Sequence, residues 1–351
     1  MFRGSSVSLL SAALLVAVVA NGCEDDTVNV KQPAPVPPAL LTCQLWYAAS
    51  PPISVDEESA LSPDNAVRVF WYNIEPDYGA TVRDFDPEVS DENDAPVVTM
   101  HIDLDVFPQD PSRWAGVMTG FSGSWDGYSG SGGVPGGLDP LDLSEAKIIK
   151  FWVNDFKASP ADRGGKIYVE FGFIDEDFYR PDLNEYDRED RDGNGFTVGG
   201  DHNEDTGLDG VPTGQEGDDP DDDYDSHRIA ADGNRFARIN GTEGNGRPDD
   251  EDLDGDAQLG LLDAYFRYEV SLSDSAVLDV RRDYPTFSDF KNPLDSWRLY
   301  EIRLEDYDAV TTAGRVPYRD EIKHMRIWFD DVAAVFNPMV GCVQIRELEF
   351  E

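Results

Sequence analysis

The sequence predicts an all-β protein, a jelly-roll-like β-sandwich with a long acidic calcium-binding insertion. Three observations lead to this prediction. About ten short segments have the composition and period of β-strands and are separated by turn residues. No segment shows the apolar period of an amphipathic helix of useful length. Residues 181–263 are rich in Asp and Gly and poor in apolar side chains, so we expect them to interrupt the sandwich rather than build its core.

The clearest strand pattern is Val97–Phe107, where Val98, Met100, Ile102 and further apolar residues alternate with polar ones. A period of two predicts a strand with one buried face. The other expected strands, in chain order, are Leu41–Tyr47, Val67–Tyr72, Trp114–Phe121, Ile148–Asn154, Lys166–Ile174, Ala264–Leu272, Trp297–Leu304, His324–Phe329 and Val343–Phe350. Together they predict one sandwich domain over residues 41–351, interrupted at 181–263.

The N-terminus has the pattern of an export signal. A short basic start is followed by the apolar run Leu9–Ala20, which is too short to span a bilayer, and then by Asn21-Gly22-Cys23. Small residues before a cysteine resemble a bacterial lipobox, so residues 1–22 are predicted to be a lipoprotein signal peptide with Cys23 as the lipidated residue. The alternative is an ordinary signal peptide with a chance cysteine. Residues 23–40 are Pro-rich and are expected to form an extended linker between the lipid anchor and the domain.

Two cysteines remain in the mature chain, Cys43 and Cys342. An exported protein lies in an oxidising compartment, where two such cysteines tend to pair. We therefore expect a Cys43–Cys342 disulfide that brings the first and last strands side by side, with two buried free thiols as the alternative.

The charge of the chain limits its partners. The chain has 71 acidic and 28 basic residues, a formal net charge of −43, which excludes nucleic acid because phosphate contacts need Lys and Arg. Residues 181–263 hold about 26 of the 71 acids. That density indicates that cations take part in ordering the segment, and the alternative is a solvated acidic loop that binds cations diffusely.

The acids of the insertion have the spacing of calcium loops. Ca²⁺ takes six to eight oxygen ligands, and alternate residues of a tight turn point their oxygens inward. Three stretches have such spacing, and the ligands that they predict are Asp190, Asp192, Asn194, Asp201, Asn203, Asp205, Asp209, Asp252, Asp254, Asp256 and Asp263. Zinc is not expected, because the four histidines are dispersed and no cysteine pair has ligand spacing.

The sequence contains few candidate catalytic or glycan-binding residues. Four carboxylates lie at and after one strand end, where two at a suitable separation could serve a glycoside hydrolase: Glu170, Asp175, Glu176 and Asp177. Such proximity is expected by chance in so acidic a chain. No nucleophile elbow, zincin or phosphate-loop motif is present. Trp125 and Tyr128 lie in a Gly/Ser-rich loop and could stack on sugar rings, with local packing as the alternative. We therefore expect a protein that is not an enzyme.

Several blocks, in order, resemble the soluble β-rich segments of the SprA family, the outer-membrane translocon of type IX secretion and gliding. These blocks are Ser112–Phe121, Leu143–Asp155, Gly164–Asp177, Asp205–Pro212, Arg247–Leu272, Trp297–Tyr307 and Glu321–Phe329. The family's members are far longer and include a large transmembrane part, so translocation is not implied here. The resemblance implies a sandwich with a calcium-ordered acidic insertion at an outer membrane, facing the periplasm or the cell surface.

These observations predict a calcium-binding envelope lipoprotein that is held at the membrane by its lipid anchor. It would act as a structural module or bind envelope or secretion proteins. A glycan-binding surface lipoprotein is the alternative.

Overall fold

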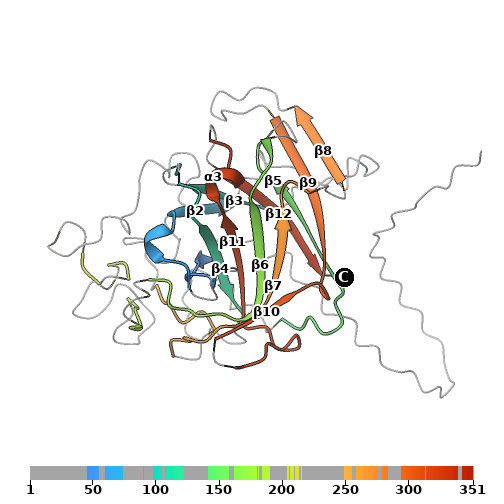
Figure 1. Ribbon diagram of the computed structural model, residues 1–351. Helices are drawn as coiled ribbons and strands as arrows, with labels where there is room; N and C mark the ends of the chain where they lie inside the picture. Colours follow the sequence, from blue (N-terminus) through green and yellow to red (C-terminus); the bar gives the residue numbers. More distant parts are fainter. Residues whose placement is uncertain are drawn as a thin grey trace, which may run out of the picture. The chain divides into compact units, whose positions relative to one another are not determined.

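The computed structural model contains two antiparallel β-sheets (Figure 1). It describes residues 46–54, 60–73, 90, 98–104, 107–108, 110–121, 141–157, 162–179, 181, 184–189, 204, 206–208, 210–212, 215, 249–254, 258–274, 278–283, 294–312, 314–338 and 342–350. The first sheet has the order β1-β4-β11-β6-β7-β10. Its strands are β1 (Tyr47–Ala48), β4 (Ala115–Gly120), β6 (Lys166–Phe173), β7 (Ala264–Ser271), β10 (Asp308–Thr311) and β11 (His324–Asp330).

The second sheet has the order β2-β3-β12-β5-β9-β8. Its strands are β2 (Val69–Asn73), β3 (Thr99–Leu104), β5 (Ile148–Asn154), β8 (Leu278–Asp283), β9 (Leu294–Arg303) and β12 (Cys342–Phe350). Two short helical turns, η2 (Pro63–Asn65) and α3 (Val332–Val335), complete the elements. Most strands that neighbour one another in a sheet are not consecutive in the chain, which is typical of a jelly roll, and the predicted all-β sandwich is confirmed.

The core lies between the two sheets. Alternate residues of each strand face inward and form one apolar cluster that draws on both sheets, as the period of two requires. Phe171 of β6 packs edge-on against Phe350 of β12, with ring centroids 5.4 Å apart. The Tyr268 hydroxyl donates to the Leu304 carbonyl at 3.1 Å, which satisfies its polar end inside the sandwich.

Three details differ from the sequence-based expectation. The strands β8 and β10 were not predicted, because these segments are short and rich in polar residues, and the turn α3 was not predicted because four residues are too few to show a helical period. The strand β3 is not half-buried, since its polar residues Thr99 and His101 are 1% and 6% exposed. The strands β1 and β12 lie in different sheets, so the first and last described strands are not side by side. Cys342 pairs in register with Asp103 of β3, whereas Cys43 and the predicted disulfide lie outside the described residues.

The acidic insertion between β6 and β7 is attached to the outer face of the first sheet. Leu253 packs there with Met118, Ile174 and Tyr265 in a small buried cluster. The backbone of Leu253 comes so close to β4 that a Cβ on Gly120 would lie 1.9 Å from the Leu253 carbonyl oxygen. A glycine at this position is therefore required for the insertion to reach the sheet.

Two parts of the insertion also pair with each other. Arg188 and Asp250 form an antiparallel bridge, the Glu189 N–H donates to the Asp249 carbonyl at 3.0 Å, and the Glu251 N–H donates to the Asp187 carbonyl at 3.3 Å. The chain therefore leaves β6 and returns to β7 as a short two-stranded ribbon. Within the described residues, no helix is long and apolar enough to cross a membrane.

Candidate metal centre

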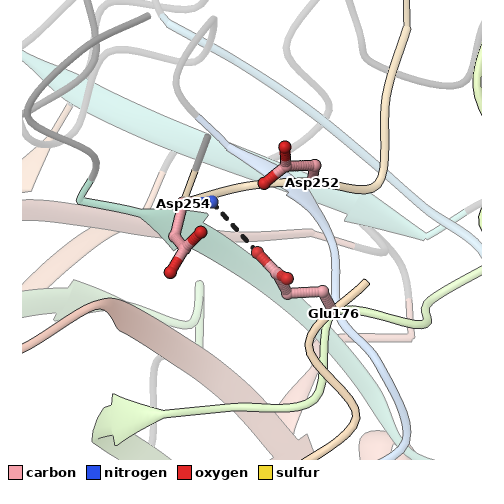
Figure 2. A group of neighbouring side chains, drawn as sticks. All are labelled: Glu176, Asp252 and Asp254. Atoms are coloured by element: carbon pink, nitrogen blue, oxygen red, sulfur yellow. Dashed lines mark hydrogen bonds between the residues drawn. The ribbon is translucent and has the colours of Figure 1, made fainter. Parts of the chain in front are cut away.

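Within the described residues, Glu176, Asp252 and Asp254 form a group of carboxylates that could share a metal ion (Figure 2). Glu176 follows the end of β6 by three residues, and the two aspartates belong to the returning arm of the ribbon before β7. One carboxylate oxygen from each residue lies within 4.8 Å of the other two. Calcium binds oxygen at about 2.3–2.6 Å, so two ligands on opposite sides of the ion are about 5 Å apart, and this spacing fits a shared cation.

Glu176 already organises the loop around it. Its Oε1 accepts hydrogen bonds from the Leu253 N–H at 2.8 Å and the Asp254 N–H at 3.0 Å, and its Oε2 accepts one from the Gly260 N–H at 2.8 Å. Hydrogen bonds to an ionised carboxylate are stronger than neutral ones. Glu176, which is 1% exposed, therefore holds the returning arm against the end of β6.

His324 of β11 is a fourth donor to Glu176. The Ile174 N–H donates to His324 Nδ1 at 3.1 Å, so this nitrogen must lack a proton. The proton then lies on Nε2, which donates to Glu176 Oε1 at 3.0 Å. The imidazole is neutral in this arrangement and does not compensate the charge of the carboxylate.

Two more buried glutamates of the insertion bind backbone in the same way. Glu251 accepts from the Tyr179 N–H at 2.8 Å and the Asp187 N–H at 3.0 Å, one at each oxygen. Glu189 accepts from the N–H groups of Thr206 and Asp249, at 2.8 and 2.9 Å. These carboxylates accept hydrogen bonds from backbone N–H groups in segments that have no neighbouring strand to bond to. These bonds between carboxylates and peptide groups are therefore a source of order in the insertion that does not depend on cations.

Carboxylates nevertheless outnumber compensating charges around the centre. The buried acids in the described parts of the insertion and of the segment that leads into it from β6 are Glu176, Asp177, Asp187, Glu189, Glu204, Asp249, Glu251, Asp252 and Asp263. Lys323 Nζ lies 3.7 Å from Asp254 Oδ2, and the nearby Arg188 is exposed. Such a concentration of buried negative charge is costly unless a cation or protons offset it.

The pKa values of the acids near the centre also reflect the excess of buried negative charge. Burial raises the pKa of the Glu251 carboxyl to about 8, and the charges of Asp177 and Asp187 add to the rise. Burial likewise raises the pKa of Asp175 to about 7, with the charges of Asp263 and Asp177 also raising it. The pKa of Asp250 is raised by burial to about 6. The protein environment therefore disfavours the ionised forms of these acids in the absence of a metal.

The structure places only some of the predicted ligands. Asp252 and Asp254 lie in the group with Glu176. Asp263 lies outside the group, and its Oδ1 accepts from the Asp175 N–H at 3.2 Å. The remaining predicted ligands Asp190, Asp192, Asn194, Asp201, Asn203, Asp205, Asp209 and Asp256 lie outside the described residues, as do Cys23, Trp125 and Tyr128. Glu176 was missed as a ligand because nothing in the sequence connects it with residues more than 70 positions away.

Glu170, considered above as a catalytic acid, has a structural position. It is fully buried, and its carboxylate accepts from Arg267 Nε at 2.7 Å, Arg326 Nε at 2.6 Å and Trp328 Nε1 at 3.0 Å. The two arginines also donate to the carbonyl oxygens of Ile53 and Ser50, at 2.6 and 3.1 Å. This network ties the segment after β1 to the outer face of the first sheet.

A comparison with protein-family models gives no match for this chain, and neither does a comparison with curated proteins. Among solved structures, the chain is similar to a carbohydrate-binding module that was studied for specific mannan recognition. The two are 10% identical, the match covers 87% of this chain and 96% of that chain, and the TM-score is 0.23. A likeness at this level carries no argument about what the present chain binds.

Proposed function

We propose that this protein is a calcium-stabilised, non-enzymatic module of a bacterial cell envelope. It is tethered to the outer membrane by a lipid on Cys23, faces the periplasm or the cell surface, and acts as a structural or protein-binding domain. The export signal, the cysteine after it and the Pro-rich linker support the tether. The resemblance to SprA-family segments favours a partner in secretion or surface assembly.

The juxtaposition of Glu176, Asp252 and Asp254 carries the calcium part of the proposal. The two arms of the insertion bring these carboxylates together from opposite ends of a long segment. Hard oxygen ligands in excess favour Ca²⁺ over zinc or copper. Because Glu176 Oε1 already accepts peptide hydrogen bonds, the ion would be held mainly by Asp252 and Asp254 and would complete the loop that Glu176 begins.

The experiment uses the mature full-length chain in chelator and in millimolar calcium. Calcium that binds only the folded state stabilises it by about 2.7 kcal/mol at a hundred times the dissociation constant, which raises the melting temperature. The Asp252→Asn/Asp254→Asn double variant should lose this gain, and an Asp274→Asn variant at an exposed turn should keep it. Chelator should also expose residues 181–263 to protease while the sandwich persists. Calorimetry without heat of calcium binding, together with an unchanged melting temperature, would show that the metal assignment is wrong.

The envelope assignment has a separate test. Expression of the full chain in a diderm host with a radioactive or clickable fatty acid should label it, and Cys23→Ala should abolish the label. Co-purification with secretion components from the native host would support the protein-binding role. Glycan binding, the alternative predicted from Trp125 and Tyr128, would be favoured by glycan-array binding that Trp125→Ala abolishes.

A further inference from the structure

The strand β10 forms one edge of the first sheet. It pairs with β7 on one side only, in the register Asp308↔Arg267 to Thr311↔Ala264. Three of its four residues are exposed and Val310 is half-buried. Among the described residues, no strand pairs with the other side of β10, so this edge presents unpaired peptide groups.

The alternation of hydrogen-bonded and non-bonded pairs between β10 and β7 identifies which peptide groups of β10 point outward. The Thr312 N–H donates to the Asp263 carbonyl at 3.0 Å, one step beyond the β10–β7 register, so 312 and 263 form a hydrogen-bonded pair. Such pairs alternate with non-bonded ones in an antiparallel ladder. Val310 and Asp308 therefore bond to β7, whereas the N–H and C=O groups of Ala309 and Thr311 point away from it.

The hydrogen bonds on the opposite side of β7 are consistent with this alternation. The Leu272 N–H donates to the Gly165 carbonyl at 3.1 Å, so the even-numbered residues of β7 bond to β6. The odd-numbered residues must then bond to β10. Ala309 and Thr311 offer two donors and two acceptors, in the spacing that an added strand needs.

Exposed apolar side chains flank this edge. Most of the exposed large apolar side chains in the described part of the chain fall in two segments: Leu261, Leu262, Tyr307, Val316 and Tyr318. The pairing of Thr312 with Asp263 brings the two segments together. Arg319 lies over the rings of Phe266 and Tyr307, with distances of 5.4 and 5.3 Å to the ring centroids, which places the segment after β10 beside the edge. Exposed Tyr, Leu and Val around unpaired peptide groups are typical of an interaction surface.

The charge of the chain indicates the chemistry of the occupant. Asp308 stands exposed on the edge strand itself, and the whole chain carries a net charge of −43. Two copies of β10 would place like charges together, which disfavours pairing between copies. A basic segment would be attracted over a long range and would place a Lys or Arg opposite Asp308.

We infer that the edge of β10 is a docking site for an extended basic segment of a partner protein, in which apolar residues alternate with Lys or Arg. The segment adds one strand to the first sheet, bonds to the peptide groups of Ala309 and Thr311, and packs its apolar side chains near Tyr307. This inference rests on the proposed role as a binding module and is independent of calcium binding.

The test uses the mature full-length chain and three short synthetic peptides. One alternates Val with Lys and Arg, one has the same composition with its Val residues grouped, and one alternates Val with Glu. The alternating basic peptide should bind best by fluorescence anisotropy and should slow hydrogen exchange at the amides of Ala309 and Thr311. Ala309→Pro removes one outward donor and is tolerated at an edge strand, so it should fold and weaken binding about tenfold.

A charge pair of variants keeps the test decisive if Ala309→Pro fails to fold. Asp308→Lys should weaken binding of the basic peptide several-fold, and Asp274→Lys, with the same change in net charge at an exposed turn, should not. Absence of binding, equal binding of all three peptides, protection of other amides, or equal effects of the two Lys variants would each overturn the inference. None of these outcomes changes the calcium-dependent melting temperature, so a failure here is distinct from a failure of the metal assignment.

Discussion

Replacement of Glu176 by glutamine tests whether a buried carboxylate holds the insertion in place. The side chain keeps its size, but one carboxylate oxygen becomes an amide NH₂ group that cannot accept a hydrogen bond. If this group faces the Gly260 N–H, the variant loses one charge-assisted bond, worth about 1.5–3 kcal/mol. The bonds from Leu253, Asp254 and His324 become neutral ones of about half the strength. Relief of the buried charge offsets part of this loss. We expect a net loss of about 3 kcal/mol in the free energy of unfolding.

The assay is urea unfolding in the presence of chelator, so that any bound metal does not contribute. Amide hydrogen exchange adds the location, since exchange should accelerate at Leu253, Asp254 and Gly260 and stay slow in the strands of the second sheet. Glu269→Gln is the matched control, because Glu269 is exposed, its bond to Lys166 lies at the surface and its bond to Tyr168 is only part-buried. It should cost less than about 1 kcal/mol. A loss for Glu176→Gln no greater than that of the control would refute the clamp, that is, the role of Glu176 in holding the returning arm of the insertion against the end of β6.

Three further predictions concern the sheets. Glu170→Gln leaves two buried guanidinium groups without their carboxylate and should cost about 3–5 kcal/mol in urea unfolding; a loss below 1 kcal/mol would contradict the buried network. Gly120→Ala should push the Leu253 backbone away and increase proteolysis of the insertion, whereas Gly164→Ala, whose Cβ would meet its nearest neighbour at 3.7 Å, should not; equal digestion of the two would argue against the close approach. Burial lowers the pKa of His101 from 6.5 to about 3, so its contribution to stability is complete above pH 6.5 and is lost at about 1.4 kcal/mol per pH unit as pH falls toward 3. The urea midpoint should therefore fall less steeply with acidification in His101→Gln, and identical slopes would show that His101 does not titrate in this way.

The sequence was sufficient for the sandwich and insufficient for the centre of the insertion. Long apolar strands such as β5, β6 and β11 can be recognised from their composition and period, and their predicted bounds agree with those of the structure within one residue. Sequence period does not reveal that the outer faces are covered as well, which is why the polar face of β3 was expected to be exposed. Short polar strands such as β10 form because β7 offers a partner, and no local pattern records that partner.

The acidic insertion shows why a residue count alone misjudges such a segment. A stretch poor in apolar residues cannot fold by burial, and from this fact we expected cations to take part in ordering it. The structure contains a second source of order, because Glu176, Glu189 and Glu251 accept peptide N–H groups from distant parts of the same segment. Each of these bonds places negative charge in a buried position, so the more the carboxylates organise the backbone, the greater the uncompensated charge becomes. A calcium ion at Asp252 and Asp254 would reduce that charge without taking the peptide donors from Glu176. The clamp and the ion would then stabilise the same loop together, so that each contributes more when the other is present. In a double-mutant cycle between Glu176 and Asp254, the free energy of unfolding lost in the double variant should therefore be smaller than the sum of the two single losses.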